Sequence, residues 1–250
     1  MSTVTAESEY VVLYGIPWEM YEGITSALSE CHLRHTYVAG TLEIRRCLVG
    51  VDWKAYQAFL RALGDRGVRH TFHEGTLEIM SPLKDHDWIK RLIGRMIEAI
   101  TLELDLDIQS IGSTTITGEK IEWGLQPDEA YYVGNEKKVR GKRRYDPKKD
   151  PPPDLVVEVD VTNSCVQRLP GFAAIRVPEI WRHDGKTLQF LKRDHQGKYR
   201  EVKHNVAFPF LSPGDLQASL DQIEHVRETE LIRNFVKLAL QRYRDFMRIN

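Results

Sequence analysis

The chain has 250 residues, of which 42% are hydrophobic and 28% are charged, and its formal net charge is −1. This length and composition are typical of a globular protein that can bury a sizeable core. The absence of any run of 18 apolar residues argues against a membrane-spanning helix, and the near-zero net charge gives no whole-molecule case for nucleic-acid binding.

The cysteines and the N-terminal residues indicate a compartment. Cys31, Cys47 and Cys165 are odd in number and stand in no CxxC or Cys/His pattern. This argues against a disulfide framework and a structural zinc site, and it fits a reducing environment. The N-terminal stretch MSTVTAESEY is polar and acidic, unlike a signal or transit peptide. We therefore expect a cytoplasmic protein with no membrane partner.

An internal repeat occupies the first third of the chain. Residues 13–44 align without a gap to residues 48–79, and 14 of the 32 positions are identical. Each copy predicts a helix followed by a β-hairpin; in the second copy Asp52 is the expected N-cap, Gly64 ends the helix and Gly75 takes the turn. Two copies are too few for a solenoid, so we interpret them as a local duplication that extends one edge of a sheet. The shared His, Arg and Trp residues suggest a site, but a structural unit copied for packing is the better explanation.

The segments after the repeat predict a mixed α/β fold. We expect a long helix over 81–104, strands over 107–118, 124–134 and 154–163, a loop over 135–153, a short helix over 168–179 leading to a further strand, a hairpin around 195–197, an irregular segment over 208–216 and a closing helix over 227–247. This order predicts a mixed sheet with a helix on each side.

The segment 154–161 carries acids along one face of a predicted strand. Its other face is wholly apolar, because side chains alternate along a strand. The strand is too apolar for a sheet edge, so Glu158 and Asp160 should be partly covered and should need a metal ion or a basic partner. Asp128, in the preceding predicted strand, can lie within a metal's width of Glu158, since neighbouring strands are about 4.8 Å apart. Spacing alone leaves two interpretations open, a Mg²⁺ or Mn²⁺ site and structural acids paired with Arg or Lys.

A set of motifs gives the sequence a resemblance. GTLEIMSP, an HD pair at the start of the long helix, GSTT, GLQPDEAYYV, PPPDLVVEVDVT and RLPGFAAIRVPEIW occur in this order. Together they resemble the large bacterial family of putative restriction endonucleases, formerly a domain of unknown function, within the PD-(D/E)XK nuclease superfamily. The resemblance covers residues 48 to about 200.

The resemblance implies a domain organisation. It implies an α/β protein with a mixed sheet and a restriction-endonuclease-like αβββαβ core. We expect the first repeat copy, 1–47, to pack on this core, a nuclease-like domain over 48–226 with the second copy at 48–79, and a C-terminal helix over 227–250.

The resemblance also implies roles for particular residues. Asp128 falls on the acid of the PD element and Glu158 on the (D/E) position; both would hold Mg²⁺ or Mn²⁺, with Asp160 as a further candidate ligand. The metal would activate a water molecule and stabilise charge at the scissile phosphate. His86 and Asp87 fall near the start of the core helix, where such nucleases often place an acid that contacts metal or water. A packing role for His86 on the apolar face of that helix is the alternative.

One position departs from the superfamily pattern. Asp160 stands where the superfamily has a Lys that positions or deprotonates the water. Many members of the family carry this Lys in the following helix, eleven residues before the Glu of the VPE element. Counted back from Glu179, that position is Arg168, which stabilises charge but is a poor general base because it stays protonated.

A basic loop lies between the two strands that carry the candidate metal ligands. Its cations are Lys137, Lys138, Arg140, Lys142, Arg143, Arg144, Lys148 and Lys149. Such a loop would attract a phosphate backbone, but a solvated connection without a function is the alternative interpretation.

Three hypotheses follow. The leading one is a Mg²⁺-dependent DNA endonuclease, in which Asp128 and Glu158 lie on adjacent strands and point to one face, with the helix over 84–104 packed nearby. The second is a nuclease fold that binds nucleic acid or protein without turnover. The third is that the duplicated unit builds an interaction surface, for example in a homodimer.

Overall fold

The computed structural model describes residues 9–31, 33–64, 66, 68–80, 84–118, 123–142, 146, 149–160 and 166–249. The chain divides into two compact units. The first comprises Met1–Pro82, Thr117–Gln126 and Thr162–Gly171, and the second comprises Leu83–Ile116, Pro127–Val161 and Phe172–Asn250. The second repeat copy thus groups with the first copy and not with the segments that carry the candidate ligands.

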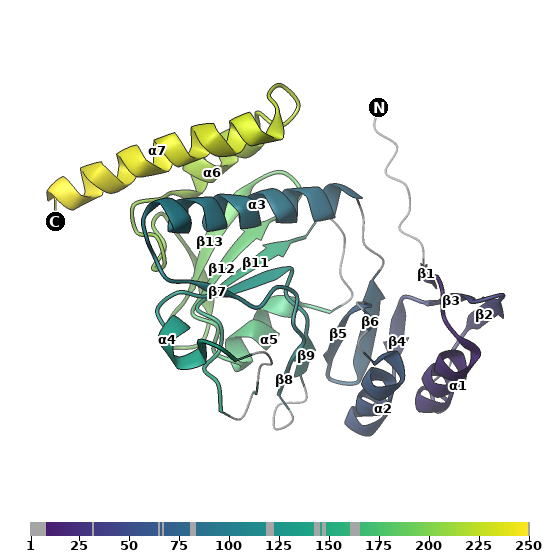
Figure 1. Ribbon diagram of the computed structural model, residues 1–250. Helices are drawn as coiled ribbons and strands as arrows, with labels where there is room; N and C mark the ends of the chain where they lie inside the picture. The colour runs from purple at the N-terminus through teal and green to yellow at the C-terminus, as the bar shows by residue number, and fades with distance from the viewer. Residues whose placement is uncertain are drawn as a thin grey trace. The chain divides into compact units, whose positions relative to one another are not determined.

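The first unit contains both repeat copies (Figure 1). Its elements are β1 (Tyr10–Leu13), α1 (Trp18–Ala27), β2 (His35–Val38), β3 (Thr41–Arg45), β4 (Cys47–Val49), α2 (Trp53–Leu63), β5 (Arg69–His73), β6 (Thr76–Met80), β8 (Ile116–Gly118) and β9 (Trp123–Leu125). The strands form a three-stranded sheet of order β1-β3-β2 and a five-stranded sheet of order β4-β6-β5-β9-β8.

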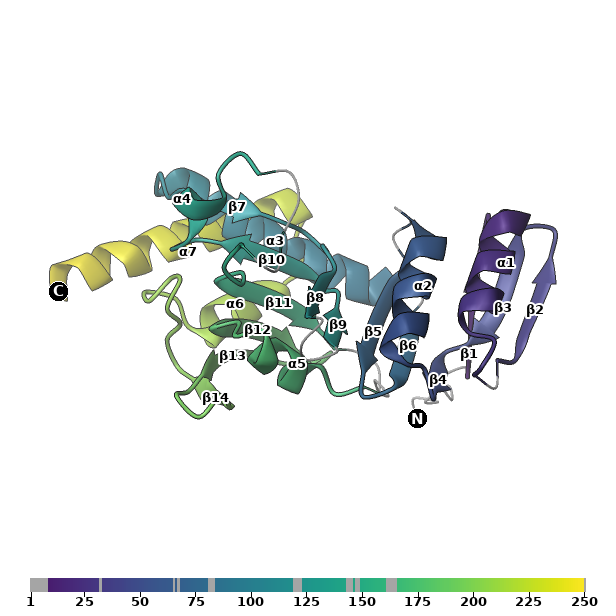
Figure 2. The ribbon, with the colours of Figure 1, turned by 90° about the horizontal axis from the view of Figure 1, so that it is seen from below.

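The two copies have the same element order and the same hairpin register. Tyr37 pairs with Leu42 in the β2–β3 hairpin, as Phe72 pairs with Leu77 in the β5–β6 hairpin. Helices α1 and α2 lie side by side (Figure 2), and Gly23 allows the close approach, because a Cβ there would lie 3.0 Å from the Cβ of Ala62. The buried apolar side chains of both copies form one continuous core.

The second unit is built around a six-stranded sheet. Its elements are α3 (Lys84–Glu103), β7 (Gln109–Ser110), β10 (Glu129–Tyr132), α4 (Glu136–Val139), β11 (Leu155–Val159), β12 (Glu179–His183), β13 (Leu188–Arg193), β14 (Tyr199–Val202), α6 (Pro213–Leu220) and α7 (Glu228–Ile249), while α5 (Arg168–Ala174) begins in the first unit and ends in the second. The sheet order is β14-β13-β12-β11-β10-β7, with β11 and β12 parallel and the other pairs antiparallel.

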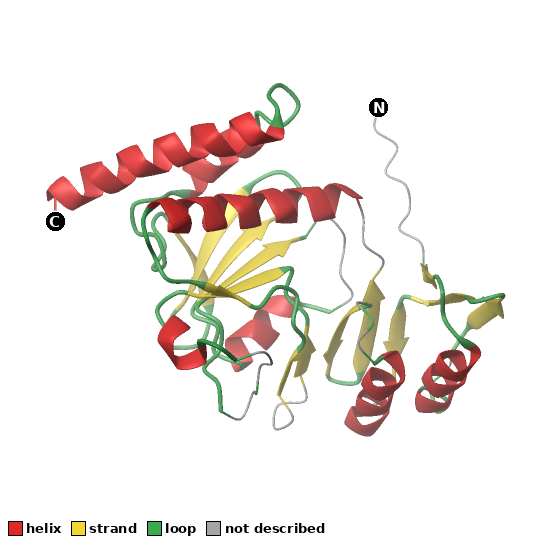
Figure 3. Ribbon diagram, in the orientation of Figure 1, coloured by secondary structure: helices red, strands yellow, loops and turns green. Residues whose placement is uncertain are grey.

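Helix α3 covers one face of this sheet, and α7 packs on α3 (Figures 1 and 3). Every second side chain of β11 points toward these helices, because side chains alternate along a strand. These are Leu155, Val157 and Val159, which share one core with Leu92 and Met96 of α3. The apolar face expected from the sequence around 154–161 is therefore the face that α3 covers.

Several expected elements differ from the observed ones. The single strand expected over 107–118 is two short strands, β7 and β8, in different sheets. The strand expected over 124–134 is also divided, into β9 and β10, because Pro127 lacks the amide hydrogen that a continuous ladder requires. The expected loop over 135–153 contains the one-turn helix α4, and the expected irregular segment over 208–216 contains the start of α6.

Helix α6 begins with a capping box. The Ser212 side chain accepts a hydrogen bond from the Asp215 amide at 3.3 Å, the Asp215 carboxylate accepts one from the Ser212 amide at 2.9 Å, and Pro213 occupies the first turn. The sequence pattern Ser-Pro-Gly-Asp indicates the start of this helix, so the expectation of an irregular segment over 208–216 was wrong from residue 213 onward.

Two further observations bear on the sequence expectations. None of the helices in the described part of the chain is long and apolar enough to cross a membrane. Cys31 is buried with a free thiol, whereas Cys47 is disulfide-bonded, which differs from the expectation of fully reduced cysteines; Cys165 lies outside the described residues.

Candidate active site

Asp128 lies close to the end of β11, the strand that carries Glu158. Strands β10 and β11 are antiparallel, with Ala130 opposite Val156. Asp128 immediately precedes β10, and Glu158 is the residue before Val159 in β11. Because side chains alternate along a strand, Glu158 projects from the face of β11 that also carries Val156.

Both carboxyl groups are buried. Asp128 is 1% exposed and Glu158 is 5% exposed. The Oδ2 atom of Asp128 accepts a hydrogen bond of 2.7 Å from the backbone amide of Val159, and this bond holds the Asp128 side chain against the end of β11. Two carboxylates removed from water and close together repel each other unless positive charge or protons compensate them. The pair is thus suited to hold a cation.

The opposite face of the same strands is a separate environment. Glu129 points toward α3, where its Oε1 lies 3.6 Å from the Nζ of Lys90, and burial raises the pKa of the Glu129 carboxyl while Lys90 opposes the rise. Gly94 leaves room for the Tyr131 hydroxyl on this face. Helix α3 thus packs on the face of β11 opposite to Glu158.

Asp160 follows β11 and pairs with a cation. Its Oδ2 accepts a hydrogen bond of 2.9 Å from the Nη2 of Arg182 in β12. The parallel register also places Arg182 beside Glu158. Asp160 is therefore in an ion pair, and Arg182 supplies positive charge next to Glu158.

Arg182 is the residue that the sequence interpretation missed. The β11–α5–β12 segment is a strand–helix–strand crossover, which places the second strand parallel to the first. This rule, applied to the strand over 179–183, is the signal that would have brought Arg182 to the neighbourhood of Glu158.

The other predicted site residues are Arg168, His86 and Asp87. Arg168 is described with the first unit, and its Nη2 donates to the backbone carbonyl of Gln126 at 2.5 Å. His86 and Asp87 belong to α3, but their side chains lie outside the described residues.

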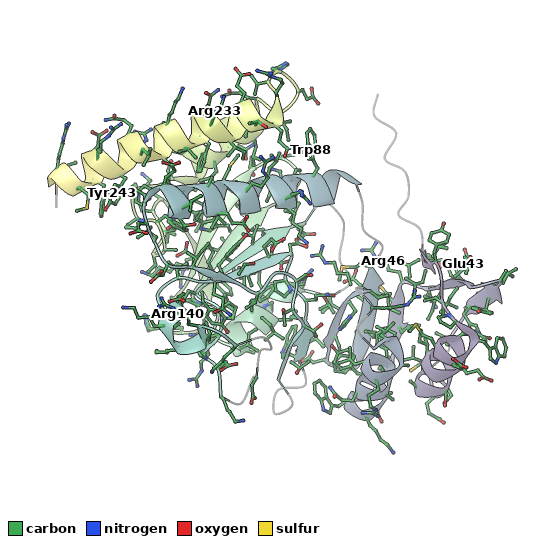
Figure 4. The ribbon with its side chains drawn as sticks, in the orientation of Figure 1. Glu43, Arg46, Trp88, Arg140, Arg233 and Tyr243 are labelled. Atoms are coloured by element: carbon green, nitrogen blue, oxygen red, sulfur yellow. The ribbon has the colours of Figure 1, made fainter. Side chains whose placement is uncertain are left out.

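Three of the eight cations of the basic loop pair with acids in the described structure. Arg140, labelled in Figure 4, contacts both Glu136 at 2.6 Å and Asp107 at 2.8 Å, and these acids raise the pKa of its guanidinium. Lys142 pairs with Asp150, and Lys149 lies 3.2 Å from Asp146. Arg143, Arg144 and Lys148 lie outside the described residues. These ion pairs support the interpretation of a solvated, internally paired connection over that of a dedicated phosphate-binding loop.

The donor set fits a hard divalent cation. Within the described ranges, no group of three or more His, Cys, Asp or Glu residues could by itself hold a metal ion. Mg²⁺ does not require such a group, because it commonly binds one or two carboxylates and completes its shell with water and substrate phosphates. Two buried carboxylates, one in β11 and one directly before β10, are compatible with this mode of binding.

A comparison with protein family models shows which family this chain belongs to. The family model Uma2, described as "Putative restriction endonuclease", matches residues 53–223. The chain belongs to this family. The family match begins at the first residue of α2, so α1 and the first hairpin lie outside it, and it includes Asp128, Glu158, Asp160, Arg168 and Arg182.

Among solved structures, this family member is similar to a protein described as "a putative nuclease belonging to DUF820" from Anabaena variabilis ATCC 29413. The two share 14% sequence identity with a TM-score of 0.47, over 65% of this chain and 96% of the other. None of the curated proteins matches the sequence.

Proposed function

We propose that the protein is a Mg²⁺- or Mn²⁺-dependent DNA endonuclease of the PD-(D/E)XK type. The observation that carries the proposal is the pair Asp128 and Glu158, both buried, with Asp128 hydrogen-bonded to the amide of the residue that follows Glu158, in a chain of the restriction endonuclease family. Buried acids close together require compensating charge or protons, and a nuclease reaction requires a cation at the phosphate.

The element order supports this assignment. We infer that α3, β7, β10, β11, α5 and β12 are the αβββαβ core of the superfamily, since they follow one another in that order when β8 and β9, which pair in another sheet, are set aside. In this assignment Asp128 immediately precedes the second core strand and Glu158 lies in the third.

Asp128 and Glu158 would hold the metal ion, which when bound activates water and stabilises charge at the scissile phosphate. Asp160 would act indirectly, because its ion pair with Arg182 sets the charge beside Glu158. Arg168 would stabilise developing charge, and His86 or Asp87 would contact the metal or its water from the start of α3.

We also infer that the two helix–hairpin units arose by duplication, since they share sequence, element order and register. DNA as the substrate fits a cytoplasmic location, which we retain as part of the proposal.

Cleavage of supercoiled plasmid with Mg²⁺ or Mn²⁺, against a chelated control, tests the proposed function. Glu158→Gln and Asp128→Asn each remove one negative ligand, so we expect both to abolish metal-dependent nicking, while DNA binding persists or tightens as repulsion of the phosphates falls. Glu129→Gln is the matched control, because Glu129 directly follows Asp128 in the sequence but its side chain faces α3. Equal nicking by the wild type and Glu158→Gln would refute the assigned site.

The second candidate function is a nuclease fold that binds nucleic acid without turnover. The observation in its favour is Asp160, an acid at the position of the superfamily Lys, held in an ion pair with Arg182. A wild-type protein that binds DNA but shows no metal-dependent nicking on any DNA substrate would establish this alternative.

A further inference from the structure

The two repeat copies carry the same cluster of aromatic side chains. In the second copy the ring of Tyr56 stacks on Phe72 with centroids 4.5 Å apart, and its hydroxyl lies 3.1 Å from the Nε2 of His70. In the first copy Tyr21 stacks on Tyr37 at 4.4 Å and lies 3.1 Å from the Nε2 of His35. A tryptophan at the start of each helix, Trp18 or Trp53, packs beside the stacked pair. The two clusters thus have equivalent geometry.

In the second copy a strand covers this cluster. β9 pairs antiparallel with β5, and Gly124 stands opposite Phe72. A Cβ on Gly124 would collide with the hydroxyl and ring of Tyr56, so a side chain at this position does not fit. Under this cover Tyr56 is 0% exposed and His70 is 3% exposed. The covering strand therefore needs a glycine where it crosses the tyrosine.

In the first copy the same edge is open. β2 is the last strand of its sheet, and among the described residues no strand pairs with its outer edge. Trp18 is 57% exposed and Val38 is 65% exposed. An open strand edge beside an exposed tryptophan and two partly buried tyrosines is a template for another extended chain.

We propose that the edge of β2, together with Trp18, Tyr21 and Tyr37, binds an extended segment of a partner polypeptide that has a glycine between two apolar residues. The segment adds as an antiparallel strand, as peptides add to sheet edges in β-augmentation. Its glycine lies opposite Tyr37, because Tyr21 occupies the place that Tyr56 occupies under Gly124.

The flanking residues of the partner segment follow from β9. Leu125 pairs with Thr71, whose equivalent is Thr36, and the ring of Trp123 stacks on His73 with centroids 3.4 Å apart. The equivalent of His73 is the exposed Val38, which favours an apolar neighbour. The strand β2 of another molecule of this protein does not satisfy the pattern, because its sequence, HTYV, contains no glycine.

Binding of a synthetic peptide to the full-length chain tests the proposal. The probe is a dye-labelled peptide with the sequence of residues 120–128, KIEWGLQPD, measured by fluorescence anisotropy. We expect saturable binding, and binding weaker by about tenfold or more when the peptide glycine is replaced by alanine. No binding at millimolar peptide, or equal binding of the alanine peptide, would overturn the proposal.

Variants of the chain locate the bound peptide. Trp18→Ala and Tyr37→Ala each remove an aromatic ring from the proposed binding surface, so each should weaken binding by about tenfold. Trp88→Ala removes a tryptophan on α3 that is 41% exposed, and it should leave binding unchanged. Circular dichroism of each variant confirms that it is folded. If Tyr37→Ala binds as the wild type does while Phe72→Ala does not, the peptide has exchanged with β9 in the second copy, and the proposal is wrong.

Discussion

Arg182 is a cation next to two acids of the candidate site, Asp160 and Glu158. Its guanidinium binds Asp160 at 2.9 Å, and its backbone is in register with Glu158. The charge of Asp160 is thereby compensated by a residue that is distant in sequence.

If the proposed nuclease function is correct, Arg182→Ala should lower the nicking rate by about tenfold or more, because it leaves the Asp160 charge uncompensated beside the metal ligands. Arg182→Lys keeps the charge and should retain most of the activity. Rates on supercoiled plasmid, with thermal unfolding of each variant as the control for folding, measure this. An Arg182→Ala enzyme as active as the wild type would exclude the role of Arg182.

His70 makes stability depend on pH. Burial lowers the pKa of its imidazole below the ordinary value of 6.5, and the ring contacts the Tyr56 hydroxyl and the Val68 carbonyl. The unfolded chain takes up a proton near pH 6.5 and the folded chain does so only at lower pH, so stability is present above pH 6.5 and is lost as pH falls below it.

We therefore expect the free energy of unfolding to fall below pH 6.5, with at most about 1.4 kcal/mol per pH unit from His70. His70→Gln keeps a hydrogen-bonding side chain without a titrating group, so its stability should fall less steeply between pH 6.5 and 5. Urea unfolding at several pH values measures both slopes. Parallel slopes for the two proteins would contradict the assignment to His70.

At the scale of elements, the sequence predicts best where the pattern is local. The apolar periodicity over 81–104 and 227–247 corresponds to α3 and α7, and the alternation around 154–161 corresponds to β11. The regions 107–118 and 124–134 were each expected as one strand, because alternation does not reveal that consecutive short strands join different sheets. That division depends on pairing between residues far apart, such as Thr71 with Leu125, which no local pattern encodes.

The capping box of α6 gives an element-scale prediction. Ser212→Ala removes the side-chain acceptor for the Asp215 amide and should lower the free energy of unfolding by about 1 kcal/mol. The matched control is Ser29→Ala, since Ser29 is exposed just after α1. Urea midpoints of the two variants report the difference. Equal midpoints would mean that the pairing of Asp215 with Arg242 holds this end of the helix without Ser212.

For the whole molecule, the family motifs predicted the restriction endonuclease family, which the family match confirms. The roles of Asp128 and Glu158 stay predictions. The distribution of the chain over two units was not predictable, because the second repeat copy is continuous in sequence with the family motifs but shares its core with the first copy. The ion pair of Asp160 with Arg182 depends on this same three-dimensional pairing.

The shared core gives a prediction for the whole chain. Deleting residues 1–46 leaves the entire family match but removes α1 from its contact with α2, around Gly23 and Ala62. We expect the melting temperature to fall by about 5 °C or more, because apolar surface of α2 becomes exposed. Differential scanning calorimetry of the truncated and full-length chains tests this. An unchanged melting temperature would show that the first copy adds nothing to the core of the second.

The cover over Tyr56 has a consequence for the chain as it is being made. β9 follows β5 by roughly fifty residues, and synthesis at about 5–20 residues per second delivers it roughly 3–10 s later. During this interval the β5 edge of the nascent chain is uncovered, as the β2 edge is left uncovered by the described strands of the folded chain. The growing chain therefore presents two equivalent strand edges, and β9 later covers the one at β5.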